Sequence, residues 1–148
     1  MIGGVTKFGG RSRDAHALVA HLGKDQPGGA IYVAGPTTAA ANMAGLVAEA
    51  RLLAAARGVQ ARPFLHLHLS PSSSLARAPL MRAAEIVLQE LGVTDQPWGV
   101  EFHGKDRRSG TGEIHAHIVV GSAGVSGSLL RSGFEKIRVE TAVRIAEF

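Results

Sequence analysis

The stretch Glu113-Ile-His-Ala-His-Ile-Val-Val120 largely decides which fold the sequence predicts. Its alternating pattern indicates a β-strand, because successive side chains of a strand point to opposite faces of the sheet. His115 and His117 then share one face, with their side chains about 7 Å apart along the strand. The residues on the opposite, buried face are Ile114, Ala116, Ile118 and Val120. The stretch therefore predicts a half-buried strand that carries two imidazoles on its polar side.

A second predicted strand, residues 98–103, lies just before the first and ends in Val100-Glu-Phe-His103. The two strands are too close in the chain for a crossover helix, which predicts a mixed or antiparallel sheet. A hairpin would bring His103 alongside His115 and His117, and three imidazoles that converge in this way can chelate a divalent ion. Glu101 shares the face of His103, where it could orient a histidine or act as a base. The competing interpretation is a set of polar residues on a solvated sheet face.

The remaining pattern alternates between helix and strand within one domain, residues 1–148. Apolar stripes and capping residues predict helices over 13–24, 38–57, 74–91 and 133–147. Strands are predicted over 29–34, 62–70, 98–103 and 113–120. The fold class is therefore α/β, of the α+β kind, with a central and mainly antiparallel sheet flanked by helices.

Further histidines lie outside the predicted hairpin. His66 and His68 share one face of the strand 62–70 with Phe64 and Ser70. They could line the same cleft as the other three histidines, but a hydrogen-bonded structural role is favoured over metal ligation. His16, in the first predicted helix, is expected at the surface.

The composition excludes several classes of protein. A chain of 148 residues with 45% hydrophobic and 19% charged residues is too apolar to be disordered and long enough to bury one core. It has no cysteine, which excludes disulfides and thiolate metal sites. It has no run of 18 apolar residues and no secretory signal, so we expect a cytoplasmic protein. The apolar last residue, Phe148, suggests a piece of a longer protein, and the net charge of +4 permits nucleic-acid binding.

The order of these motifs resembles that of the DNA relaxases of plasmid mobilisation. The paired histidines on a strand, the third histidine upstream and the segment Phe64-Leu-His-Leu-His-Leu-Ser70 before a helix carry the resemblance. Similar pieces also include the early helix 14–24, Gln89-Glu-Leu-Gly92 and Phe134-Glu-Lys-Ile-Arg138, so nearly the whole chain is covered. More narrowly, the chain looks like the large group of HUH-type nickases that includes the conjugative relaxases of broad-host-range and Ti plasmids.

The resemblance implies a single relaxase domain that nicks one DNA strand at a plasmid transfer origin and so begins conjugative transfer. It implies a metal held by His103, His115 and His117, with the 5′ phosphate of the cut strand left covalently on the protein. The implied metal is Mn²⁺ or Mg²⁺, with Zn²⁺, Ni²⁺ or Co²⁺ as alternatives. The implied partners are single-stranded and hairpin DNA of the origin, accessory relaxosome proteins and a coupling protein. The enzyme itself would be a monomer in the bacterial cytoplasm that does not engage a membrane.

The residue that would attack the phosphate departs from the usual pattern. Relaxases of this group usually place a tyrosine near the end of the first helix, whereas this sequence has Leu18-Val-Ala-His-Leu22. His21 resembles the nucleophile of a minority of relaxases, which form a phosphoramidate, and a neutral imidazole is a competent nucleophile near pH 7. The alternatives are Tyr32, the single tyrosine of the chain, and a site that is catalytically dead or takes its nucleophile from elsewhere. The structural interpretation of Tyr32 is a strand aromatic, with Ile31 and Val33 facing the core.

Two smaller departures concern the metal strand. Asp106 lies three residues after His103, and Gly121 stands where an asparagine often ends the strand. The acidic partner of a metal histidine therefore stays open among Glu101, Asp106 and Glu113.

Basic residues near these motifs are candidates for DNA contacts, namely Arg11, Arg13, Lys105, Arg107 and Arg108. Such side chains would neutralise backbone phosphates rather than read bases. A charge cluster is more often a solvated face, and only proximity to the predicted metal loop favours Arg107 and Arg108 as contacts.

Three other functions compete with the nickase interpretation. A rolling-circle replication initiator shares the paired-histidine chemistry but more often places its nucleophile after the metal motif. A non-catalytic module could bind origin or hairpin DNA with a vestigial metal site. A small metallohydrolase would have no connection with DNA.

Overall fold

A computed structural model of the chain describes residues 2–6, 12–22, 31–59, 61–71, 75–105, 113–130 and 135–146. Five strands form one sheet: β1 (Ile2–Thr6), β2 (Ile31–Ala34), β3 (Phe64–Ser70), β4 (Trp98–Lys105) and β5 (Glu113–Gly121). Their order across the sheet is β1-β3-β5-β4-β2, and every neighbouring pair is antiparallel. The prediction of a central antiparallel sheet flanked by helices is confirmed.

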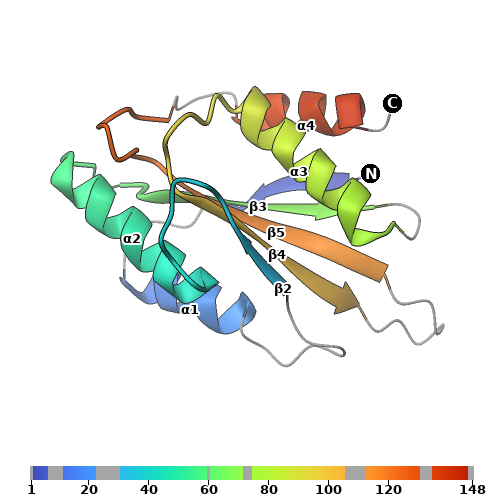
Figure 1. The fold of residues 1–148 in the computed structure, drawn as a ribbon, viewed down its shortest axis with the longest axis horizontal. Helices are drawn as coiled ribbons and strands as arrows, with labels where there is room; N and C mark the ends of the chain where they lie inside the picture. The colour runs from blue at the N-terminus through green and yellow to red at the C-terminus, as the bar shows by residue number, and fades with distance from the viewer. Residues whose placement is uncertain are drawn as a thin grey trace.

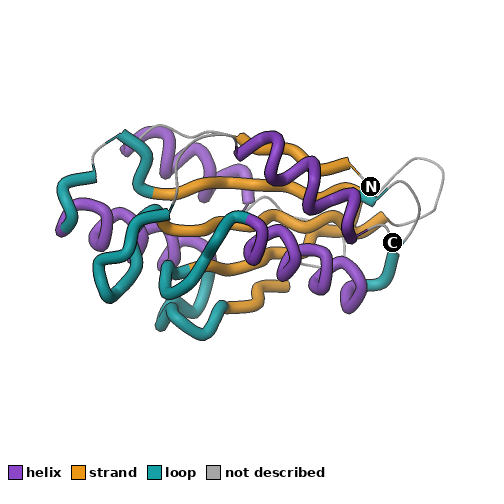
Figure 2. The backbone as a smooth tube through the Cα atoms, turned by 90° about the horizontal axis from the view of Figure 1, so that it is seen from above, coloured by secondary structure: helices purple, strands orange, loops and turns teal. Residues whose placement is uncertain are grey.

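The helices lie in two pairs, one on each face of the sheet. They are α1 (Ser12–Leu22), α2 (Met43–Ala56), α3 (Arg77–Glu90) and α4 (Glu135–Ala146). α1 and α2 lie below the sheet in Figure 1, and α3 and α4 lie above it. Seen from above in Figure 2, the two pairs are also displaced from each other along the strands. The sheet is therefore the middle of three layers, and each helix pair covers one end of its own face.

The alternation of side chains along β3 and β5 assigns the two apolar cores to opposite faces. On one face the odd-numbered leucines of β3 and Ile118 of β5 pack against Leu80 and Val87 of α3 and Val139 of α4. On the other face Phe64 and Val119 pack against Leu18 of α1 and Leu46 of α2. This second cluster occupies only the end of the face where β3 begins and β5 ends. The histidines lie further along the same face.

Most predicted elements are present with shifted ends. The helix predicted from residue 38 begins at Met43 because Asn42 caps it, its side-chain oxygen accepting a hydrogen bond from the Gly45 backbone N–H at 2.8 Å. The predicted end is confirmed at Gly58, whose φ of +70° suits a residue without a side chain.

Two expectations about strands were wrong. β1 was not predicted, because its sequence Ile-Gly-Gly-Val-Thr has two glycines, which have low strand propensity. Its pairing with β3, where Gly3 lies opposite Leu69, holds it in the sheet. Ile31 does not face the core: it is the first residue of an edge strand and is 44% exposed, whereas Val33 packs against the α3/α4 core as expected.

No helix within the described ranges is long and apolar enough to cross a membrane.

Candidate metal centre

The β4–β5 hairpin brings together the three histidines that were predicted to hold a metal. His103 lies directly opposite His115, and Glu101 lies directly opposite His117. Residues that are two apart on a strand share a face, and so do residues directly opposite on neighbouring strands. All four side chains therefore stand on one face of the sheet, and the predicted convergence of the histidines is confirmed.

The three imidazoles form a close cluster that could hold a metal ion. Each offers one ring nitrogen, and these nitrogens lie within 4.8 Å of one another. The ring of His117 lies 4.8 Å from those of His103 and His115, measured between centroids. His103 and His117 are buried, and His115 is half-buried. Metal–imidazole bonds of about 2.0–2.1 Å would require these nitrogens to lie closer than 4.8 Å, so an ion would draw the three rings together.

Glu101 is bonded to one of these histidines. Its Oε1 lies 2.5 Å from Nε2 of His103, and both side chains are nearly fully buried. A carboxylate in this position fixes the orientation of a ligating imidazole and raises its basicity. The contact engages Nε2, so Nδ1 is the nitrogen of His103 that is available to an ion. Two roles were predicted for Glu101, to orient a histidine or to act as a base, and this geometry supports the first.

A fourth histidine joins the cluster from the neighbouring strand. Nε2 of His66, on β3, lies 3.0 Å from Nδ1 of His117. The two ring planes are 13° apart and their centroids are separated by 5.2 Å. The predicted hydrogen-bonded role of His66 is confirmed.

Burial favours the neutral form of two of these imidazoles, those of His66 and His117. Burial, followed by the nearby His68, lowers the pKa of His66 to about 4. Burial, followed by the nearby His66 and His115, lowers the pKa of His117 far below its usual value. A neutral imidazole keeps the lone pair that binds a metal, so these shifts favour ligand chemistry over positive charge.

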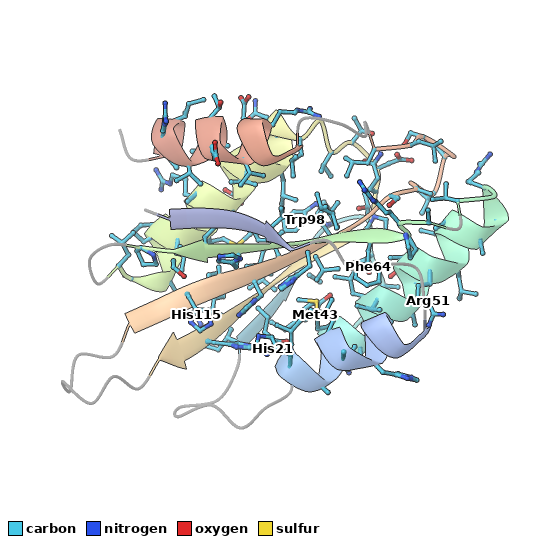
Figure 3. All side chains as sticks on the ribbon, turned by 180° about the vertical axis from the view of Figure 1, so that it is seen from behind. His21, Met43, Arg51, Phe64, Trp98 and His115 are labelled. Carbon is cyan, nitrogen blue, oxygen red and sulfur yellow. The ribbon has the colours of Figure 1, made fainter. Side chains whose placement is uncertain are left out.

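His21 lies beside the cluster, at the C-terminal end of α1. Its ring is 5.7 Å from that of His117 between centroids, with the planes 84° apart. Leu18 and Leu22 are fully buried against α2 and the sheet and anchor this last turn, while the His21 side chain itself is exposed. Figure 3 shows His21 at the end of α1 that faces the part of the sheet carrying His115.

Tyr32 lies on the same face but is directed elsewhere. It is opposite Glu101 in the β2–β4 pairing, and its ring lies over Gly99, where an added Cβ would be 2.6 Å from Cε2 and 2.9 Å from the hydroxyl. The hydroxyl is buried and has no hydrogen-bond partner among the described residues. Burial, followed by the charges of Glu49 and Glu101, raises the pKa of Tyr32 above its ordinary value. The phenol is therefore held neutral on the α2 side of Glu101, away from His103.

Several predicted site residues cannot be placed beside the cluster. Arg11, Asp106, Arg107 and Arg108 lie outside the described residues. The backbone of three others is described without their side chains: Arg13 in the first turn of α1, Lys105 at the end of β4 and Glu113 at the start of β5. Lys105 and Glu113 are directly opposite each other, one step beyond the pair formed by Gly104 and Ile114. His16 is exposed, as predicted.

Two features of the site had no clear signal in the sequence. The choice of His117 as the partner of His66 depends on the β3–β5 register, in which His68 rather than His66 lies directly opposite His117. Gly121 ends β5 because Pro97 approaches closely: an added Cβ would lie 2.8 Å from the proline Cγ. The glycine that replaces the usual asparagine is thus explained by local packing.

Comparison of the chain with protein-family models, with curated proteins and with solved structures gives no significant match.

Proposed function

We propose that this protein is a metal-dependent DNA nickase of the relaxase kind, which cuts one strand at a plasmid transfer origin. The observation that carries the proposal is the position of His21, whose ring lies 5.7 Å from His117 of the histidine cluster. Metal-assisted phosphoryl transfer to a protein side chain requires at least a nucleophile beside a metal-binding site. The resemblance in motif order supplies the choice of DNA as substrate.

His21 is the proposed nucleophile in preference to Tyr32. The imidazole is exposed at the end of α1, where a phosphate can approach it. The Tyr32 hydroxyl is buried and its pKa is raised, and so the side chain would rarely be in the phenolate form that attacks. The geometry therefore favours a histidine mechanism.

The proposed reaction is a transesterification. The unprotonated nitrogen of His21 attacks the scissile phosphorus, a P–N bond forms and the bond from phosphorus to the 3′ oxygen breaks. The imidazole N–H proton is lost as the bond forms, and the 3′ oxygen takes a proton from solvent water as it leaves. The acceptor of the imidazole proton would be Glu101, which also orients His103, or an equivalent carboxylate. The product is a 5′-phosphoramidate on the protein, which is labile in acid and durable in alkali.

A divalent ion held by His103, His115 and His117 would polarise the non-bridging phosphate oxygens and stabilise the charge that develops on them. Three neutral imidazoles suit Mn²⁺, Co²⁺, Ni²⁺ or Zn²⁺ better than Mg²⁺, which prefers oxygen ligands. We therefore propose Mn²⁺ as the working ion ahead of Mg²⁺.

The test is covalent capture of DNA. The probes are a library of single-stranded oligonucleotides of random sequence, labelled at the 3′ end, and supercoiled plasmids that carry transfer origins, each incubated with Mn²⁺. The wild-type protein should retain label after denaturation, and the chelator EDTA should prevent this. His21→Ala should abolish capture, whereas Tyr32→Phe should capture DNA normally.

Mass spectrometry of the adduct identifies the nucleophile. An adduct on Tyr32, or undiminished capture by His21→Ala, would show that the histidine mechanism is wrong. If the protein binds hairpin DNA but never forms an adduct, the non-catalytic binding module is the better interpretation. If it binds no single-stranded DNA at all, the small metallohydrolase is favoured instead.

A further inference from the structure

We infer that His66 is a positioning residue for the metal centre: it accepts a hydrogen bond from Nδ1 of His117 and thereby directs Nε2 of that ligand to the ion. The inference rests on the metal site of the proposed function but not on its DNA chemistry. It assigns a role to a residue of β3, outside the β4–β5 hairpin that supplies all three ligands.

The first support is the geometry of the histidine pair. The two ring nitrogens are 3.0 Å apart, an ordinary hydrogen-bond length. The two ring planes are nearly parallel, yet the ring centroids are 5.2 Å apart. This distance equals the separation of the two nitrogens plus about one ring radius for each imidazole. The rings therefore lie edge to edge in almost one plane instead of face to face. In this arrangement the N–H of one ring points along the in-plane lone pair of the other.

The second support is chemical. A metal binds the unprotonated nitrogen of an imidazole, and the nitrogen of His117 next to His66 is occupied by the hydrogen bond. Nε2 of His117 is then the ligand atom, Nδ1 carries the proton and donates it, and Nε2 of His66 is the acceptor. A neutral His66 must carry its own proton on Nδ1. One hydrogen bond thus defines the tautomers of two residues.

The third support is burial. His66 is 4% exposed and His117 is 6% exposed, so water cannot readily replace the acceptor. Hydrogen-bond partners of this kind typically contribute 10–100-fold to metal affinity because they hold the ligand ring in the binding orientation.

The first experiment measures Co²⁺ binding by calorimetry and by visible absorption. His66→Phe keeps a flat ring but has no acceptor, so its affinity should fall by about 10–100-fold. His66→Gln places an amide oxygen near the lost nitrogen and should recover most of the affinity and the wild-type spectrum. The matched control is His16→Phe, the same change at an exposed position on α1, which should bind Co²⁺ as the wild type does.

The second experiment needs no substitution. In the Zn²⁺-loaded protein, ¹⁵N NMR of the imidazoles should show His117 protonated on Nδ1 and His66 protonated on Nδ1 with Nε2 free of a proton. A proton on Nε2 of His117, or equal Co²⁺ affinity of the wild type and a folded His66→Phe, would overturn the inference. If the wild type itself binds no metal, the proposed metal site fails first, and the two failures are therefore distinguishable.

Discussion

At the scale of single residues, the site depends on which face of the sheet each side chain occupies. His103, His115 and His117 meet because alternate positions of two paired strands face the same way. His21 reaches the cluster from a helix, and Glu101 and His66 hold two of the rings through hydrogen bonds. Each role can be tested by a substitution that leaves the sheet intact.

We predict one divalent ion per chain, bound by the three histidines of the hairpin. Calorimetry with Mn²⁺ should detect this site in the wild type and lose it in both His115→Ala and His117→Ala, because two imidazoles hold an ion much more weakly than three. His16→Ala, which removes an exposed histidine from α1, should bind as the wild type does. Unchanged binding in both hairpin variants would contradict the assignment.

The placement of Tyr32 over Gly99 predicts energetic coupling between the two positions. Gly99→Ala would push its Cβ against the tyrosine ring and should cost about 1–3 kcal/mol of unfolding free energy, the usual cost of overpacking. In a Tyr32→Ala background the same change should cost less, since the main obstacle is gone. Urea denaturation of the four proteins in this double-mutant cycle measures the coupling. Strict additivity would mean that the ring lies elsewhere.

At the scale of elements, the carboxylate of Asp95 holds the segment that follows β5. This contact lies at the end of the hairpin opposite the histidines. Asp95 accepts a hydrogen bond from the Ser126 backbone N–H at 2.7 Å and another from the Ser128 hydroxyl. The same segment is closed by the bridge between Ala123 and Leu129. This clamp joins the loop before β4 to the loop after β5 and so holds the hairpin at its far end.

Asp95 should therefore make stability depend on pH in the acid range. The hydrogen bonds from Ser126 and then Ser128 hold the pKa of its carboxyl well below the ordinary value of 3.8. A lowered folded pKa adds stability that is complete above 3.8 and is lost as the pH falls through the folded pKa. Asp95→Asn should lower the urea midpoint at pH 7.

The difference between Asp95→Asn and the wild type should narrow progressively as the pH is lowered below 3.8. Glu85→Gln, which neutralises an exposed carboxylate on α3, is the matched control and should show no such trend. A gap between Asp95→Asn and the wild type that stayed constant down to strongly acidic pH would mean that the carboxylate charge does not stabilise the clamp.

At the scale of the whole molecule, the two helix pairs divide the faces of the sheet unequally. α3 and α4 cover the face behind the histidines, whereas α1 and α2 lie at the other end of the histidine face (Figure 3). A DNA strand bound at the cluster would therefore meet the end of α1 and the hairpin first. The predicted phosphate contacts, Arg107 and Arg108, belong to the chain between β4 and β5.

Replacing Arg107 and Arg108 by alanine should weaken binding of single-stranded oligonucleotides to a similar extent for any sequence. It should also flatten the dependence of affinity on salt, because fewer counterions are released. The control is Arg77→Ala with Arg82→Ala, which removes the same charge from exposed positions on α3, on the opposite face. Fluorescence anisotropy over a salt series gives both slopes. A loss confined to one sequence would indicate base contacts instead.

The sequence by itself determined the antiparallel hairpin, the apolar side of its second strand and the convergence of His103, His115 and His117. These are consequences of local periodicity and of a short connection, which need no distant contacts. Only the tertiary structure decided the position of β1, the pairing of His66 with His117 and the burial of the Tyr32 hydroxyl. Each of these depends on the order of the strands in the sheet and on where the helices pack. Both are determined by contacts between residues that are far apart in the chain.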